Sequence, residues 1–251
     1  MAKENTHLFF AHTILGHFRE TDLLKKISEY IDYYYLGSVI PDTFYYSSHK
    51  SIEMISETLH GKEGNPTNQA IFKVLDASDD MRDIAFILGY ITHCALDIIF
   101  HPIVYYLSGN YYDPEPIKKR QAVYLHRFIE TCMDVYLENP LRIYNIIDPR
   151  LLRSLKFEEI ICDEFSVSPA EATRTLRKQL FLNRLFASTA AYKLAVILHR
   201  YGTAMDVYDY LGLFYEHVTA QGNSIHRVIP YRDIISGTKK TTSIKDVMNK
   251  A

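Results

Sequence analysis

One long apolar stretch with ionisable residues in its middle constrains the fold of this chain more than any other feature. Ile84 to Leu107 spans 24 mostly apolar positions, a length that can also cross a membrane. His93, Asp97 and His101 lie inside this stretch, and such groups would be costly in hydrocarbon. We therefore predict the core helix of a soluble protein, with a buried polar site and no transmembrane segment.

Composition favours an all-α protein with a sizeable core. The 251 residues include only 10 Gly and 9 Pro, and 47% are apolar. Alternation of apolar and polar residues is absent apart from short tyrosine clusters, so we expect a strand content near zero. No repeat or flexible linker interrupts residues 1–251, so we predict a single domain. Residues 222–251 are expected to form a docked C-terminal tail, with a short helix after Ser243.

Capping residues and helix breakers predict where the main helices begin and end. The segment Ser168-Pro169-Ala170-Glu171 combines a capping box with Pro at the first helical position. The predicted helices run from Thr21 to near Gly37, from Ser48 to Gly61, from Ser78 or Asp79 to just before Pro102, and from Ser168 to Gly202.

Charge and cysteine usage restrict the partners and the compartment. Lys and Arg number 28 against 30 Asp and Glu, without a basic run, so no stable nucleic-acid complex is expected. Cys94, Cys132 and Cys162 lie far apart and form no CxxC pair, which indicates a reducing compartment. The start of the sequence lacks the pattern of a signal peptide, so a cytoplasmic location is expected. The oligomeric state is not predicted by these features.

Two pairs of ionisable residues have the spacing of one helix face. His93, Asp97 and His101 follow one another at four-residue intervals and span about 80° of a helix surface. His126 and Glu130 repeat this interval, and Asp134 continues it. A buried imidazole or carboxylate needs a partner, and a divalent metal ion is one. We interpret the pairs as two halves of a metal site.

Three further residues are candidates for the same site. Asp42 follows Pro41 at the end of a hydrophobic run, and His60 lies at a helix end before Gly61. His7, His12 and His17 follow one another at five-residue intervals, which do not place them on one face of a helix. Of these three, His7 is the preferred candidate ligand. His12 and His49 remain alternatives to one of these candidates.

The order of these motifs resembles the zinc-dependent phospholipase C family. The segments that carry the resemblance, within residues 6–130, are THLFF, GSVIPD, LHG, LGYITHCALDIIFHP and HRFIE. The DxxxHP form is similar to the intracellular-type branch of the family. The resemblance implies an all-helical fold shared with secreted single-strand nucleases, and phosphodiester hydrolysis with up to three zinc ions.

The resemblance also implies which residues bind which metal. One metal is assigned Asp42, His60, His93 and Asp97, and a second is assigned His101, His126 and Glu130. His7 matches a ligand of a third metal, for which Asp97 is the bridging carboxylate. In the secreted enzymes an N-terminal Trp completes that third site, whereas this chain contains no Trp. The cofactor is therefore predicted to be two or three zinc ions.

These residues predict a metal-dependent hydrolase of phosphodiester bonds that uses zinc-activated water. Asp42 is the candidate catalytic residue that orients or deprotonates the water, and a purely ligating role is equally compatible with the sequence. The substrate is expected to be a phospholipid or another phosphodiester. The alternatives are a non-catalytic helical metal-binding interaction protein and a nuclease-like phosphodiesterase acting on nucleotides. Tyrosine pairs at 45–46, 105–106 and 111–112 can line a cleft or belong to the core.

Overall fold

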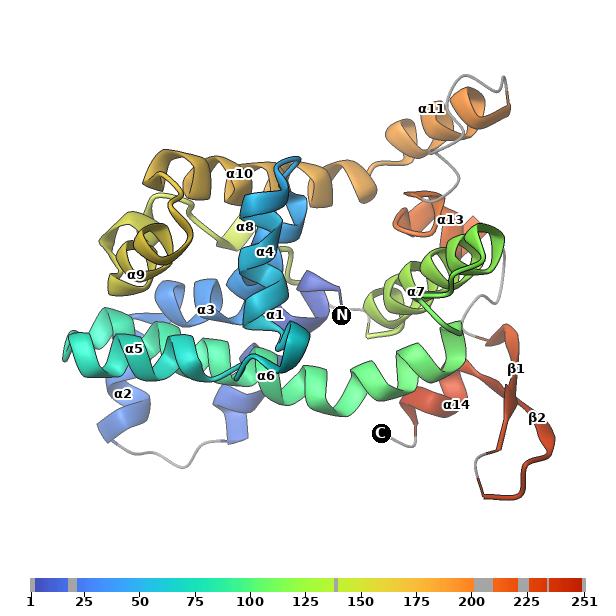
Figure 1. The fold of residues 1–251 in the computed structure, drawn as a ribbon, viewed down its shortest axis with the longest axis horizontal. Helices are drawn as coiled ribbons and strands as arrows, with labels where there is room; N and C mark the ends of the chain where they lie inside the picture. Colours follow the sequence, from blue (N-terminus) through green and yellow to red (C-terminus); the bar gives the residue numbers. More distant parts are fainter. Residues whose placement is uncertain are drawn as a thin grey trace. The chain divides into compact units, whose positions relative to one another are not determined.

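A computed structural model describes residues 3–17, 22–137, 140–200, 210–220, 226–233 and 235–249. Within these residues the chain is all-α apart from one small β-hairpin, as predicted (Figure 1). The chain forms two compact units, and each is built from separated segments. Unit 2 comprises His7–Leu96 and Leu141–Asn183, and unit 1 comprises Met1–Thr6, Asp97–Pro140 and Arg184–Ala251. The single domain expected over residues 1–251 stays a prediction.

Unit 2 is built around a core of large apolar side chains that several of its helices contribute. Leu36, Phe86 and Phe157 are almost completely buried in this core. Its elements are α2 (Asp22–Glu29), α3 (Ile31–Thr43), η1 (Phe44–Tyr46), α4 (Lys50–Leu59), η2 (Lys62–Gly64), α5 (Gln69–Ala77), α8 (Ile143–Ile146), η3 (Leu151–Ser154) and α9 (Lys156–Phe165), with most of α1 (Glu4–His17), the first half of α6 (Met81–Ser108) and most of α10 (Pro169–Phe186).

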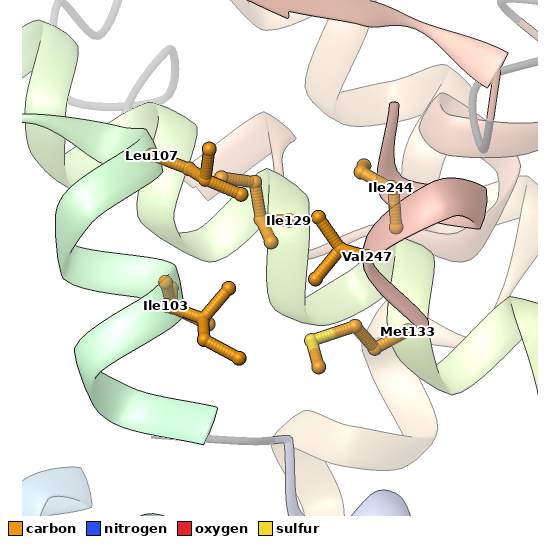
Figure 2. Close-up of a pocket in the computed structure, with 7 residues that line it drawn as sticks. Ile103, Leu107, Ile129, Met133, Ile244 and Val247 are labelled. Atoms are coloured by element: carbon orange, nitrogen blue, oxygen red, sulfur yellow. The ribbon is translucent and has the colours of Figure 1, made fainter. Parts of the chain in front are cut away.

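Unit 1 has a smaller core between the second half of α6 and the helix after it. Val104, Phe128 and Val218 are fully buried there. Its further elements are α7 (Pro116–Tyr136), α11 (Thr189–Arg200), α13 (Tyr215–Ala220), β1 (Val228–Arg232), β2 (Lys239–Ser243) and α14 (Ile244–Met248). Figure 2 shows α14 packing over this core, where a cavity of about 10 Å³ has an entirely apolar lining of Ile103, Val104, Leu107, Ile129, Met133, Ile244 and Val247. A cavity of this size holds at most one water molecule, so it is not a substrate site.

Helix α3 crosses α6 with the two backbones in contact. A Cβ atom added to Gly37 would lie 1.9 Å from the carbonyl oxygen of Phe86, and one added to Gly89 would lie 1.9 Å from that of Tyr34. Because only glycine leaves this space empty, the two glycines allow the close approach. Gly37 is thus a contact residue inside α3, and the predicted helix end near Gly37 is wrong. The single helix predicted up to that point is also wrong, because a turn at Tyr30 separates α2 from α3.

Several other predicted helix boundaries also differ from the structure. Helix α3 continues through Pro41, and α6 continues through Pro102, although proline removes a backbone donor in each. The helix predicted from Ser168 ends at Phe186, and the Ser188 side chain accepts a hydrogen bond from the Ala191 amide as α11 begins. The capping box itself is confirmed, because Ser168 and Glu171 exchange hydrogen bonds. The proposed ends at Thr21 and Gly202 lie outside the described residues.

The C-terminal tail contains the predicted short helix and an unpredicted hairpin. Ser243 caps α14 by accepting a hydrogen bond from the Asp246 amide at 3.1 Å. Strands β1 and β2 pair antiparallel, with Pro230 opposite Thr241. In a two-stranded sheet both strands are edges, so a proline is tolerated without loss of the pairing. Within the described residues the strand content is therefore near zero, as expected, and this hairpin is the exception.

Among the described residues, α6 alone is long and apolar enough to span a membrane. Half of its most apolar window is buried inside the protein. Helices α10 and α11 pass the same test only if they are counted together as one broken span.

Candidate metal centre

Four of the predicted site residues converge inside unit 2. His7 comes from α1, Asp42 from the last turn of α3, His60 from the C-terminal end of α4 and His93 from α6. His7, Asp42 and His93 are each at most 2% exposed, and they offer ligand atoms that all lie within 4.8 Å of one another.

Asp42 is the centre of this group, which we call the Asp42 cluster (His7, Asp42, His60 and His93). Its Oδ1 lies 3.2 Å from Nε2 of His60 and 3.9 Å from Nε2 of His93. Its Oδ2 lies 3.9 Å from Nε2 of His7. The rings of His7 and His93 stack with their centroids 3.8 Å apart. Three imidazoles therefore aim the same nitrogen at one carboxylate.

Backbone carbonyls orient two of these imidazoles. Nδ1 of His60 lies 2.7 Å from the Ser56 carbonyl oxygen, and Nδ1 of His93 lies 3.0 Å from that of Ser38. Because a carbonyl oxygen only accepts, each Nδ1 is assigned as the protonated donor. The neutral rings then present Nε2 lone pairs, and these two atoms are only 3.2 Å apart. Two lone pairs and a carboxylate at this separation repel one another unless a cation lies among them, so the donor set fits a metal ion.

The electrostatics of Asp42 agree with a cation site. Burial by itself raises the pKa of this carboxyl, but positive charge at the surrounding imidazoles outweighs it, with His93 and His60 contributing most. A metal ion held by the neutral rings would place positive charge at the same position. The pKa is thereby held below its usual value, and Asp42 is an anion at neutral pH.

The remaining predicted site residues lie in unit 1, and we call them the His126 cluster (Asp97, His101, His126 and Glu130). Asp97 and His101 are one turn apart on α6, with Oδ1 and Nε2 separated by 3.3 Å. On α7, Nε2 of His126 lies 2.9 Å from Oε1 of Glu130. The centroids of the His101 and His126 rings are 6.5 Å apart, so the two helical pairs face each other.

His126 lies in an aromatic environment. The rings of Tyr105 and Tyr111 lie 4.8 Å and 5.3 Å from its centroid. Burial lowers the pKa of His126 to about 2, so the ring is neutral at neutral pH and keeps a lone pair for a metal. Tyr45 lies beside His60 in unit 2 at 5.4 Å. Three of the predicted cleft tyrosines thus contact candidate ligands.

Other sequence candidates are placed elsewhere. Nδ1 of His12 contacts the Tyr35 hydroxyl at 2.7 Å, and His49 is exposed at the start of α4. Asp134, which continues the face of the His126 pair, binds the N-terminal segment instead. It accepts hydrogen bonds from the side chains of Asn5, Thr6 and Tyr215.

Sequence reasoning missed the Ser38 and Ser56 carbonyls that orient the imidazoles. These groups are main-chain atoms, so no residue type marks them. The Ser56 carbonyl lies one turn before His60 on α4, whereas the Ser38 carbonyl reaches His93 only because α3 crosses α6.

Comparison with protein families identifies the chain. The model of the family described as zinc dependent phospholipase C matches residues 6–163, which include both clusters. This chain belongs to the zinc-dependent phospholipase C family. No curated protein and no solved structure matches it.

Membership of the zinc-dependent phospholipase C family makes the chain a phospholipase-like hydrolase, and the family name gives zinc as its metal. The imidazole and carboxylate donors in the clusters are ligands that zinc prefers. The residues present therefore fit the metal that the family implies.

Proposed function

We propose that this chain hydrolyses the phosphodiester bond of phospholipids on the headgroup side of the glycerol. The observation that carries the proposal is the Asp42 cluster, in which three imidazoles face one buried carboxylate within a chain of the zinc-dependent phospholipase C family. His7, Asp42, His60 and His93 are the proposed zinc ligands in unit 2, and Asp97, His101, His126 and Glu130 are those in unit 1.

Bound zinc would supply a Lewis acid that brings the pKa of a bound water toward about 7 and attracts phosphate oxygens. Asp42 is ionised and buried, so it can accept a hydrogen bond or a proton from an attacking water. The carbonyls of Ser56 and Ser38 fix the rings of His60 and His93, which keeps the donor atoms in place. Tyr105 and Tyr111 contribute a largely apolar wall beside His126, and aromatic faces of this kind attract a cationic headgroup.

Metal analysis combined with hydrolysis assays tests the proposal. We expect the purified protein to carry at least two zinc ions and to cleave a chromogenic phosphodiester and phosphatidylcholine vesicles, but not single-stranded DNA. His93→Ala should lose metal and lower the rate by at least about a hundredfold, because it removes one ligand and leaves Asp42 buried beside an incomplete shell. His17→Ala, which alters an exposed histidine at the end of α1, should keep both the metal and the rate.

Three results would contradict this function. A metal content below one per chain, with no uptake on titration, would remove the metal site. Full metal content without hydrolysis of either phosphodiester would identify a structural metal in a non-catalytic protein. Cleavage of DNA in preference to phospholipid would assign the chain to nuclease-like phosphodiesterases.

A further inference from the structure

Helix α11 presents a continuous apolar stripe on its exposed side. Leu194, Ile197 and Leu198 are 57%, 51% and 41% exposed, and no residue of α11 is buried. Positions separated by three and four residues lie on one face of a helix, so the three side chains form one strip.

The opposite side of α11 packs within unit 1. The Tyr192 ring lies 5.9 Å from that of Phe214, and its hydroxyl lies 3.3 Å from Nδ1 of His217. The Thr189 hydroxyl donates a hydrogen bond to Glu216 of α13 at 3.0 Å. These contacts fix which face of α11 is turned outward, so the exposure of the stripe is a property of the packed helix.

The charges on α11 have one sign. Lys193 and Arg200 are exposed and lie beside each other along one edge of the stripe, within about 20° around the helix, and the helix contains no Asp or Glu. Glu216 of α13 contacts the first residue of this helix, Thr189, at the end opposite to Arg200. An apolar face with a basic edge matches the boundary of an anionic lipid bilayer, where alkyl side chains enter the headgroup region and cations contact phosphate.

We propose that α11 docks the chain on the surface of an anionic phospholipid membrane. Leu194, Ile197 and Leu198 enter the boundary between headgroups and acyl chains, and Lys193 and Arg200 contact the anionic headgroups. The biological purpose of this docking rests on the proposed function, since a phospholipase must reach substrate held in a bilayer. The docking itself needs neither metal cluster.

Sedimentation with lipid vesicles tests the docking. We expect the full chain to bind vesicles of phosphatidylcholine with phosphatidylserine at least about tenfold more tightly than vesicles of phosphatidylcholine alone, and added salt should weaken the binding. The double variant Leu194→Ser/Ile197→Ser should bind about tenfold or more weakly, because each side chain loses its apolar contact. Lys193→Gln/Arg200→Gln should lose the preference for anionic vesicles and retain the fold, as checked by circular dichroism.

A matched control separates this stripe from exposed apolar surface in general. Phe72 on α5 is also 57% exposed, and the neighbouring Lys73 is paired with Glu164 at 2.8 Å. Phe72→Ser should therefore leave vesicle binding unchanged. All variants should hydrolyse a soluble chromogenic phosphodiester at the rate of the unaltered chain, because the substitutions lie outside both clusters.

The possible failures can be told apart. Equal vesicle binding by the unaltered chain and the double variant, or no binding by either, would overturn the docking. An unaltered chain that is dimeric and a double variant that is monomeric, by light scattering, would show that a second copy covers the stripe, which also overturns it. Vesicle binding that requires Leu194 and Ile197, together with no hydrolysis of the soluble substrate, would support the docking and contradict the proposed function.

Discussion

Replacing Gly89 by alanine tests whether the crossing of α3 and α6 holds the Asp42 cluster together. The added methyl group would lie 1.9 Å from the Tyr34 carbonyl oxygen and 3.0 Å from the Ser38 amide nitrogen, whereas ordinary contact begins at 3.4 Å. The atoms in the way are helix backbone, which cannot rotate aside. The two helices must therefore separate by about 1.5 Å at this point.

The expected magnitude follows from two opposing effects. Overpacking of this kind costs up to about 3 kcal/mol, and the better helix propensity of alanine returns about 1 kcal/mol. We expect a net destabilisation of about 2 kcal/mol. His93 lies one turn after Gly89 on α6, and Asp42 lies on α3, so the separation also displaces ligands whose bonds to a metal tolerate about 0.2 Å.

Denaturant unfolding and zinc titration measure these two effects. Gly89→Ala should unfold at lower urea concentration and bind zinc about ten to a hundredfold more weakly. Gly16→Ala is the matched control, because Gly16 lies in α1 with nothing within 4 Å of an added Cβ. That variant should be as stable as the unaltered chain or slightly more so. If Gly89→Ala also gained stability and kept its zinc affinity, the close crossing would not exist as described.

Two further predictions concern buried carboxylates outside the proposed metal ligands. Asp134→Ala should destabilise unit 1 by about 2 kcal/mol in urea unfolding, because it leaves buried donors unsatisfied, whereas Asp76→Ala at an exposed position of α5 should have almost no effect. Burial raises the pKa of Glu158 despite the opposing effects of Arg153 and Thr173, so the unaltered chain should lose stability as the pH rises through this pKa. Glu158→Gln should then be more stable than the unaltered chain at pH 8 and not at pH 4, and a difference that is independent of pH would contradict this reasoning.

The fold class and the grouping of ligands along each helix could be predicted from the sequence, because both follow from periodicity. The four-residue intervals in α6 and α7 place each pair on one face whatever the rest of the chain does. Helix ends were less predictable. Glycine and proline usually end a helix, but Gly37 and Pro102 lie inside α3 and α6, where tertiary packing outweighs the local preference. Gly37 lies inside α3 because the backbone of α6 occupies the space that a side chain at this position would fill.

Which residues meet in the candidate site could be predicted only in part, because tertiary packing also determines which helices lie side by side. Distances between separate helices, such as 3.2 Å from His60 to His93, depend on crossings that no local pattern encodes. Asp134 illustrates the limit. Its spacing after Glu130 suggests a place on the same helix face. Its carboxylate instead accepts hydrogen bonds from Thr6 and Tyr215, which are distant in sequence.

The contacts of the N-terminal segment determine when it can become fixed during synthesis. The Lys3 ammonium donates to the Leu213 carbonyl at 2.7 Å across a separation of 210 residues, and it lies 4.3 Å from the centre of the Tyr215 ring. All segments of unit 2 have been made by Asn183. At about 5–20 residues per second, roughly 10 to 40 seconds pass between the appearance of Lys3 and that of its partner. Lys3 is thus synthesised before any residue of unit 2, yet it reaches its native contacts only after all of unit 2 has been made.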